Sequence, residues 1–109
     1  MSRDGIPPGT LYMLILKTLA RGVELHGFEI AKNIKKISQD VLQVEEGSLY
    51  PALQRMLIKG WVAAKWGTTS ENRRARYYRL TAAGRKQLEA EVSQFERVMQ
   101  AIIRVVEAN

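Results

Sequence analysis

The apolar residues in the last quarter of the chain place the strongest constraint on its fold. They recur at alternating spacings of four and three, at Leu88, Val92, Phe95, Met99, Ile102 and Val106. This a/d heptad pattern predicts one long helix that has Thr81 as its N-cap and ends near residue 107. Such a helix has more apolar surface than one small domain covers, so we expect a homodimer that forms through these six residues.

Two helices are predicted near the start of the chain. Residues 10–21 are apolar almost all round, which is typical of a helix buried on several sides, and Gly22 ends it. Residues 28–37 have helical periodicity, and the polar connection after them is expected to hold a very short strand around residues 43–44. The predicted inward stripe of this second helix is Phe28, Ile30, Ala31, Ile34 and Ile37, and Lys32, Lys35 and Lys36 lie outside it.

A third helix is predicted to begin at Ser48 and to end at Gly60. Pro51 has no N–H to donate, so it is expected in the first turn, where no intrahelical acceptor needs one. Leu49, Leu53, Met56 and Leu57 form the predicted inward stripe; Ser48, Pro51, Gln54, Arg55 and Ile58 point outward, and Tyr50 lies at the border. The outward face is small or polar, which suits a helix that enters a groove.

Residues 61–67 and 73–80 both alternate between two faces, which predicts a β-hairpin with a loop at 68–72. Trp61 and Trp66 are interpreted as packing residues of the hairpin and core. One of the adjacent rings of Tyr77 and Tyr78 is expected to face inward, but the alternation does not decide which.

Positive charge is concentrated before the last helix. The chain has a net charge of +6; residues 1–80 hold 13 Lys or Arg against 7 Asp or Glu, whereas residues 81–109 hold four of each kind. An excess of this size indicates a polyanionic partner. The order of three helices, hairpin and long helix predicts a mainly α winged helix-turn-helix fold, in which the third helix enters the major groove of double-stranded DNA and the hairpin contacts its backbone.

We therefore expect residues 1–80 to form a DNA-binding domain and residues 81–109 a dimerisation helix. Gln54 is the best candidate to contact a base, because glutamine can form a bidentate pair with adenine. Arg55 is expected near guanine or phosphate, and the hairpin arginines near phosphates. The full set of predicted DNA-binding residues is Lys32, Lys35, Ser48, Tyr50, Pro51, Gln54, Arg55, Lys65, Arg73, Arg74 and Arg76.

Three motifs in this order resemble those of the PadR family of bacterial transcriptional regulators: LHGFEI, GSLYPALQRM followed by KGWV, and RRARYYRLTAAGR. The resemblance covers roughly residues 10–107. It implies a winged-helix repressor that dimerises through its last helix and is often released by a small aromatic or drug-like ligand. Two recognition helices in such a dimer are expected to read successive major grooves, so the operator should be an inverted repeat. By the same resemblance, Ser48, Tyr50 and Pro51 stand at the N-terminal end of the recognition helix.

The short C-terminal segment is similar to that of compact, multidrug-responsive members of the family. In such members a tryptophan stacks on planar ligands at the dimer interface, and this chain has Phe95 at the corresponding position. Phenylalanine stacks with less area and has no indole N–H. The candidate effector-binding residues are Met13, Leu14, Leu88, Val92, Phe95 and Met99, several of which are also expected in the dimer core.

Other classes of function find little support in the sequence. His26 is the only histidine and the chain has no cysteine, so we expect neither a metal site nor a cofactor. The sequence shows no nucleophile and no group of carboxylates arranged as in an active site, so an enzyme is not expected. No segment is long and apolar enough to span a membrane, so a cytoplasmic location is expected. The alternative that remains is a winged-helix module that binds an acidic protein partner.

Overall fold

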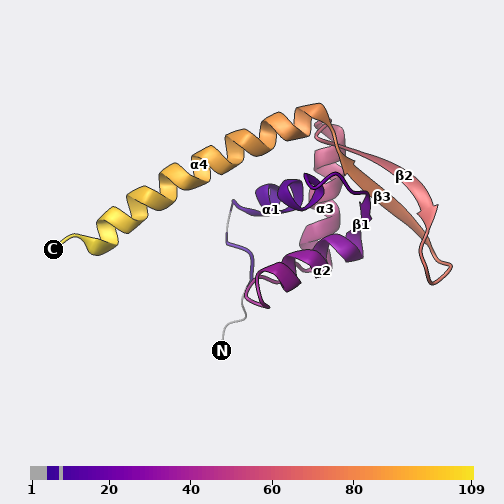
Figure 1. Cartoon of the computed structure of the whole chain (residues 1–109), viewed down its shortest axis with the longest axis horizontal. Helices are drawn as coiled ribbons and strands as arrows, with labels where there is room; N and C mark the ends of the chain where they lie inside the picture. The colour runs from indigo at the N-terminus through magenta and orange to yellow at the C-terminus, as the bar shows by residue number, and fades with distance from the viewer. Residues whose placement is uncertain (1–4, 8) are drawn as a thin grey trace.

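The computed structural model describes residues 5–7 and 9–109, so residues 1–4 and 8 of the predicted DNA-binding segment lie outside it. The described residues form four helices and a three-stranded antiparallel sheet with the strand order β1-β3-β2. The elements are α1 (Leu11–Leu19), β1 (Leu25–His26), α2 (Gly27–Ile37), α3 (Glu46–Ile58), β2 (Val62–Thr68), β3 (Arg74–Leu80) and α4 (Ala82–Glu107). This arrangement confirms the winged helix-turn-helix fold. Figure 1 shows α4 leaving the body of the domain on one side and the β2–β3 hairpin, the wing, extending from the other.

The hydrophobic core lies between the first three helices and the base of the wing. Apolar side chains that are removed from water supply most of the free energy that stabilises such a domain. The core residues are Ile15, Leu16, Leu19, Ile30, Ile34, Leu49, Ala52, Leu53, Met56, Val62, Tyr78 and Leu88. Thr18 is also buried, and its hydroxyl donates to the carbonyl of Leu14 at 2.8 Å. The predicted inward stripe of α3 is therefore confirmed at Leu49, Leu53 and Met56.

The short strand lies elsewhere than the sequence predicts. Residues 43–44 form no strand, whereas Leu25 and His26 form β1 and pair with Tyr78 and Tyr77 of β3. Pairing with β1 covers the part of the open edge of β3 at Tyr77 and Tyr78, and an exposed strand edge is otherwise a site for unwanted association. The expected strand in the connection between α2 and α3 was wrong.

Helix α3 begins earlier than predicted, at Glu46, and Pro51 consequently lies in its second turn. The extended N-cap residue Glu45 accepts hydrogen bonds at its carbonyl from the N–H groups of Ser48 and Leu49. Pro51 has no N–H for the carbonyl of Gly47, four residues earlier, but Gly47 is exposed and water can satisfy that carbonyl. The expectation that Pro51 belongs to the first turn was wrong for this reason.

Three aromatic or aliphatic residues that the sequence assigned to the core are exposed. Phe28 and Ile37, near the two ends of α2, are 63% and 55% exposed, because the buried side chains of the helix are those of Ile30 and Ile34 in its middle. Trp66 is 57% exposed, since it lies in the part of the wing beyond the core. Trp61 does pack against the domain, where its ring meets that of Tyr12 edge-on at 5.5 Å.

Thr81 is the N-cap of α4, as predicted, and its Oγ1 accepts from the N–H of Gly84 at 3.0 Å. The same oxygen lies 2.6 Å from the carbonyl of Gly60 and 3.0 Å from that of Trp61. One side chain thus connects the end of α3, the start of the wing and the start of α4. Within the described chain, none of the helices combines the length and hydropathy of a transmembrane span.

Candidate nucleic-acid interface

The pairing of β2 with β3 decides which wing residues share a face. Ala64 lies opposite Tyr78, Trp66 opposite Arg76, and Thr68 opposite Arg74. Tyr78 is 6% exposed and in the core, which settles that it, and not Tyr77, is the inward ring. Because the wing continues beyond the core, the same face then carries Trp66, Arg76 and Arg74 into solvent.

The two arginines of this face lie over the indole ring of Trp66. The guanidinium carbon of Arg74 is 4.5 Å from the ring centroid and that of Arg76 is 5.7 Å from it. Both distances are within the range of cation–π contacts. Among the described residues, the ion pairs are Lys65 with Glu24 and His26 with Glu29, so neither arginine has an acidic partner there. Their charge remains available to an anion from outside.

A pocket of about 330 Å³ separates this face of the wing from the N-terminal half of α3. Tyr50 forms its helical wall and is 44% exposed. A Cβ on Gly27 would lie 2.6 Å from Cε1 of Tyr50, so glycine is required for the ring to lie against α2. Burial, with contributions from Glu46 and Tyr78, raises the pKa of Tyr50, and its hydroxyl therefore stays protonated and able to donate at neutral pH.

Helix α3 presents the outward face that the sequence predicted. Ser48, Pro51 and Gln54 are exposed, and Leu49 and Leu53 between them are buried. Arg55 lies toward α1, where its Nε donates to the hydroxyl of Tyr12 at 2.6 Å. Arg55 is therefore not gathered with the arginines of the wing.

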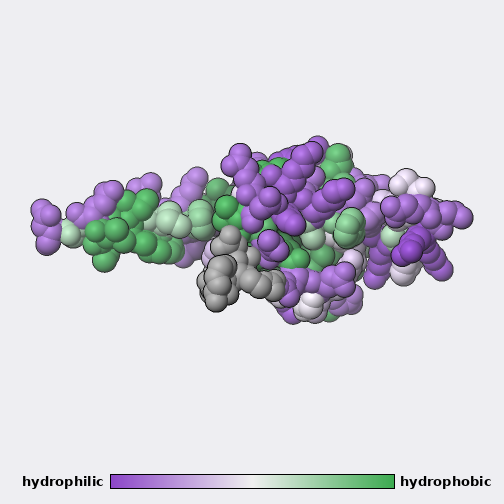
Figure 2. Space-filling view, turned by 90° about the horizontal axis from the view of Figure 1, so that it is seen from below, coloured by the Kyte–Doolittle hydropathy of each residue, from purple (hydrophilic) through white to green (hydrophobic). Residues whose placement is uncertain are grey.

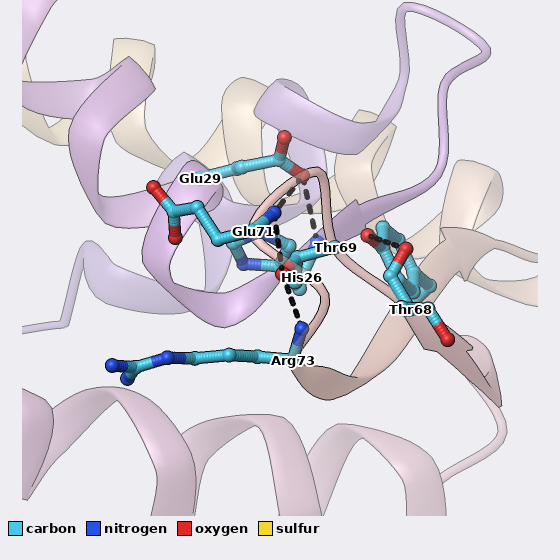
Figure 3. Close-up of polar contacts among 7 residues, drawn as sticks. His26, Glu29, Thr68, Thr69, Glu71 and Arg73 are labelled. Atoms are coloured by element: carbon cyan, nitrogen blue, oxygen red, sulfur yellow. Dashed lines mark hydrogen bonds and ion pairs between the residues drawn. The ribbon is translucent and has the colours of Figure 1, made fainter.

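The tip of the wing is a tight loop organised by Thr69. Its Oγ1 accepts from the N–H groups of Glu71 and Arg73, at 3.3 and 3.1 Å, and its own N–H donates to the carbonyl of Arg73 at 2.7 Å. Asn72 supplies the left-handed residue of the turn, with φ of 63°. Figure 3 shows the side chain of Arg73 extended away from these contacts, so the loop holds its backbone and leaves its guanidinium in solvent.

Tyr77 stiffens the opposite face of the wing. Its ring lies so close to Gly67 that a Cβ there would be 2.9 Å from Cε1, and its hydroxyl donates to the carbonyl of Thr68 at 3.4 Å. His26 meets the ring edge-on at 5.3 Å. Lys65 is on this face too, 3.1 Å from Glu24, so the structure does not bring it together with Arg74 and Arg76.

Lys32 and Lys35 are exposed on α2. The first turn of that helix, at Gly27, borders the pocket, and its later turns run away from the wing (Figure 1). Neither lysine lines the pocket that Arg74 and Arg76 border. Trp66 is the residue of this basic wing face that the sequence did not single out, although its position next to Lys65 on an alternating strand was visible.

A second pocket, of about 420 Å³, lies between the start of α1 and the middle of α4. It brings together two of the predicted effector residues, Met13 and Phe95. Leu88 is buried, and Leu14 and Val92 pack against the core, so these three are turned toward the domain itself. The remaining residues that line the pocket are Gly9, Thr10, Gln87, Ala90, Glu91, Gln94 and Val98.

The part of the chain that the structure describes contains no cluster of three His, Cys, Asp or Glu residues able to hold a metal ion.

Comparison with known proteins gives consistent results. The model of the transcriptional regulator PadR-like family matches residues 15–90. A transcriptional regulator of Clostridium thermocellum is 28% identical, with 91% of this chain and 95% of that chain covered and a TM-score of 0.82. A PadR-like transcriptional regulator of Bacillus cereus is 26% identical over 93% of this chain and 95% of its own, with a TM-score of 0.76. An uncharacterized protein of Lysinibacillus sphaericus is 29% identical over 102 residues, which are 94% of this chain and 93% of the other.

Proposed function

We propose that the chain, which belongs to the PadR-like family of transcriptional regulators, is a homodimeric repressor. Membership of this family makes it a DNA-binding regulator and not an enzyme. It binds an inverted-repeat operator, with residues 1–80 contacting DNA and residues 81–109 forming the dimer, and it acts in the cytoplasm. The observation that carries this proposal is the basic face of the wing beside the polar face of α3. Arg74 and Arg76 project there without an acidic partner among the described residues.

Phosphate contacts supply the affinity in this proposal. Arg73 at the wing tip, with Arg74 and Arg76 on the wing face, neutralises backbone phosphates and releases their counterions. The exposed N-terminal part of α3, with Ser48, Tyr50 and Pro51, lies at the next phosphates or at base edges. The phosphate contacts fix the position of the protein on the duplex and carry no sequence information.

Base recognition falls to the outward face of α3. Gln54 is exposed in the middle of that face, and glutamine matches the donor and acceptor of adenine in the major groove. Arg55 uses one N–H for Tyr12, and its remaining N–H groups lie toward a phosphate at the α1 side. Two such helices in a dimer reach successive major grooves about 34 Å apart, which is why the operator is an inverted repeat.

Titration of the protein into random-sequence duplex at several salt concentrations tests this proposal. We expect log K to fall linearly with log salt, with a slope of about −0.9 for each phosphate neutralised. Selection from a random pool is expected to enrich a palindrome. Binding that is absent or insensitive to salt, from a protein shown to be folded, contradicts the proposal and favours the rival module with an acidic protein partner.

The dimer is proposed from the apolar surface that α4 leaves uncovered. Only Gly84 and Leu88 of its 26 residues are buried. Figure 2 shows apolar side chains gathered along the projecting part of the helix. Among the seam residues, Phe95 is 36%, Met99 37% and Ile102 49% exposed, and Val106 is also exposed. Because contiguous apolar surface of this kind marks an association site, a second copy of the chain is the natural occupant.

Ile102→Glu is expected to convert the dimer to monomers. A carboxylate in the exposed part of the seam must lose its hydration in both copies at once, so the dissociation constant is expected to rise by about 100-fold or more. Analytical ultracentrifugation over a concentration series measures it. Gln100→Glu adds the same charge to the same helix outside the seam and is the matched control. Equal dissociation constants for the two variants would place the dimer contact elsewhere.

We further propose that the pocket between α1 and α4 takes a small aromatic effector. Met13 and Phe95 offer apolar and stacking contacts, and Gln87 and Gln94 offer polar ones. Met99 lies on the same seam of α4. Ligand binding there releases the operator only if one arrangement of the two subunits binds the ligand better than the other.

A further inference from the structure

Trp66 is a large aromatic residue that the core does not use. It is more than half exposed, and its strand neighbour across β3 is Arg76. Burial in the core therefore does not explain why an indole stands at this position. Its contacts are with two basic side chains, because the ring lies under the guanidinium groups of both Arg74 and Arg76. The contacts are with two residues of the proposed phosphate-binding set. Trp66 therefore sits at the centre of the basic wing face.

We propose that Trp66 is a positioning residue that holds Arg74 and Arg76 in the orientation in which they bind one DNA phosphate beside Tyr50. This inference rests on the proposed function. A free arginine side chain samples many rotamers and loses that freedom when it binds. A ring that already restrains both guanidinium groups removes part of this loss before DNA arrives.

An aromatic platform suits this role better than an acidic one. A carboxylate would also orient an arginine, but it would neutralise the charge that the phosphate needs. The indole ring attracts guanidinium through its quadrupole and leaves the net charge unchanged. Among the described residues, neither Arg74 nor Arg76 forms an ion pair with an acidic side chain, so the indole orients both arginines and their charge stays available to the phosphate.

The pocket beside the platform supplies the site for the phosphate. Trp66, Arg74 and Arg76 form its wing wall, and Tyr50 forms its helical wall across from them. No hydrogen-bond partner of the Tyr50 hydroxyl is found among the described residues, and the contact with Gly27 holds the ring in place. A phosphate in this pocket accepts from both elements, so the platform couples the position of the wing to that of the recognition helix.

A double-mutant cycle tests the positioning role. We expect Trp66→Ala to weaken binding to duplex DNA about tenfold at moderate salt, because Arg74 and Arg76 are then unrestrained in the free protein and lose more side-chain entropy when they bind. In the Arg74→Ala/Arg76→Ala background the same substitution is expected to have almost no effect, because nothing remains to be positioned. Trp66→Phe should restore part of the affinity, and Trp66→Leu, which has bulk but no π face, should restore none. An equal loss in both backgrounds, or full affinity for the leucine variant, overturns the inference.

A measurement without DNA separates this inference from the proposed function. Stacking on the indole should shift the side-chain Nε–H and Hδ NMR signals of Arg74 upfield, and Trp66→Leu should return them to ordinary values. Arg79, on the opposite face of β3, is the internal reference and should not change. If the shift is present but wild-type protein binds no duplex, the proposed function fails and the stacking stands. If wild-type protein binds duplex but the shift is absent, the positioning role fails alone.

Discussion

Replacement of Arg73, Arg74 and Arg76 by alanine is expected to reduce affinity for duplex DNA on the order of a hundredfold or more at 0.1 M salt. The same triple variant should lower the magnitude of the salt slope by about 1.8, because Arg73 contacts one phosphate, Arg74 and Arg76 share a second, and each phosphate contributes about 0.9. The three side chains are exposed on the tip and on one face of the wing, so their removal leaves the core intact. Fluorescence anisotropy with labelled duplex at several salt concentrations measures both quantities.

Two further variants distinguish the effect of net charge from that of the wing face, and distinguish affinity from sequence recognition. Arg79→Ala removes one positive charge from the same strand but from the face that points away from Trp66, and it should leave the salt slope unchanged. Gln54→Ala should also preserve the slope, and it should relax preference at particular base positions. A slope that falls equally for Arg79→Ala and Arg74→Ala would mean that net charge, and not the wing face, determines affinity.

Gly84→Ala is expected to be the most destabilising small substitution in the chain. A Cβ at this position would lie 2.0 Å from the carbonyl oxygen of Trp61 and 2.7 Å from Cδ1 of Leu80. The carbonyl belongs to the backbone at the start of the wing and cannot swing aside as a side chain would, so α4 must move away from the sheet. We expect the free energy of unfolding to fall by about 3 kcal/mol, at the upper end of overpacking costs.

Chemical denaturation monitored by circular dichroism checks this value. Gly47→Ala is the matched control, because Gly47 is also helical and a Cβ there meets nothing within 4 Å. That substitution should stabilise the protein by about 0.5–1 kcal/mol, since alanine loses less backbone entropy than glycine in a helix. If the free energy of unfolding of Gly84→Ala is within about 1 kcal/mol of the wild-type value, the backbone at the junction between the wing and α4 adjusts more easily than its geometry indicates.

Periodicity was sufficient to predict the four helices and the hairpin. The extent of α4 and its cap at Thr81 agree closely with the structure, because a long heptad pattern and a capping residue are both local features. The two-residue strand β1 was missed for the opposite reason. A strand this short has no period, and its existence depends on the open edge of β3, which is distant in sequence.

The candidate site shows a similar division between local and tertiary information. The alternation of residues 61–67 puts Trp66 on the strand face of Val62 and Ala64, as the structure has it, but it could not show that the wing extends past the core and leaves the ring exposed. It also could not choose between Tyr77 and Tyr78, because the choice depends on which face of the sheet the helices cover. The roles of the individual DNA-binding residues stay predictions until the variants above are measured.

The connection made by Thr81 has a mechanical consequence for the proposed dimer. Its oxygen holds the start of α4 to the end of α3 and the start of the wing, so these three elements move as one piece. Helix α4 is then a lever of about 39 Å for its 26 residues, and a tilt of about 10° displaces its far end by about 7 Å. If the dimer contact at the far end of α4 is held fixed, the same tilt moves the wing by about 7 Å. This is roughly a fifth of one 34 Å turn of DNA, or about two base pairs. In the proposed dimer, the crossing angle of the paired helices would therefore determine the operator spacing that the protein accepts.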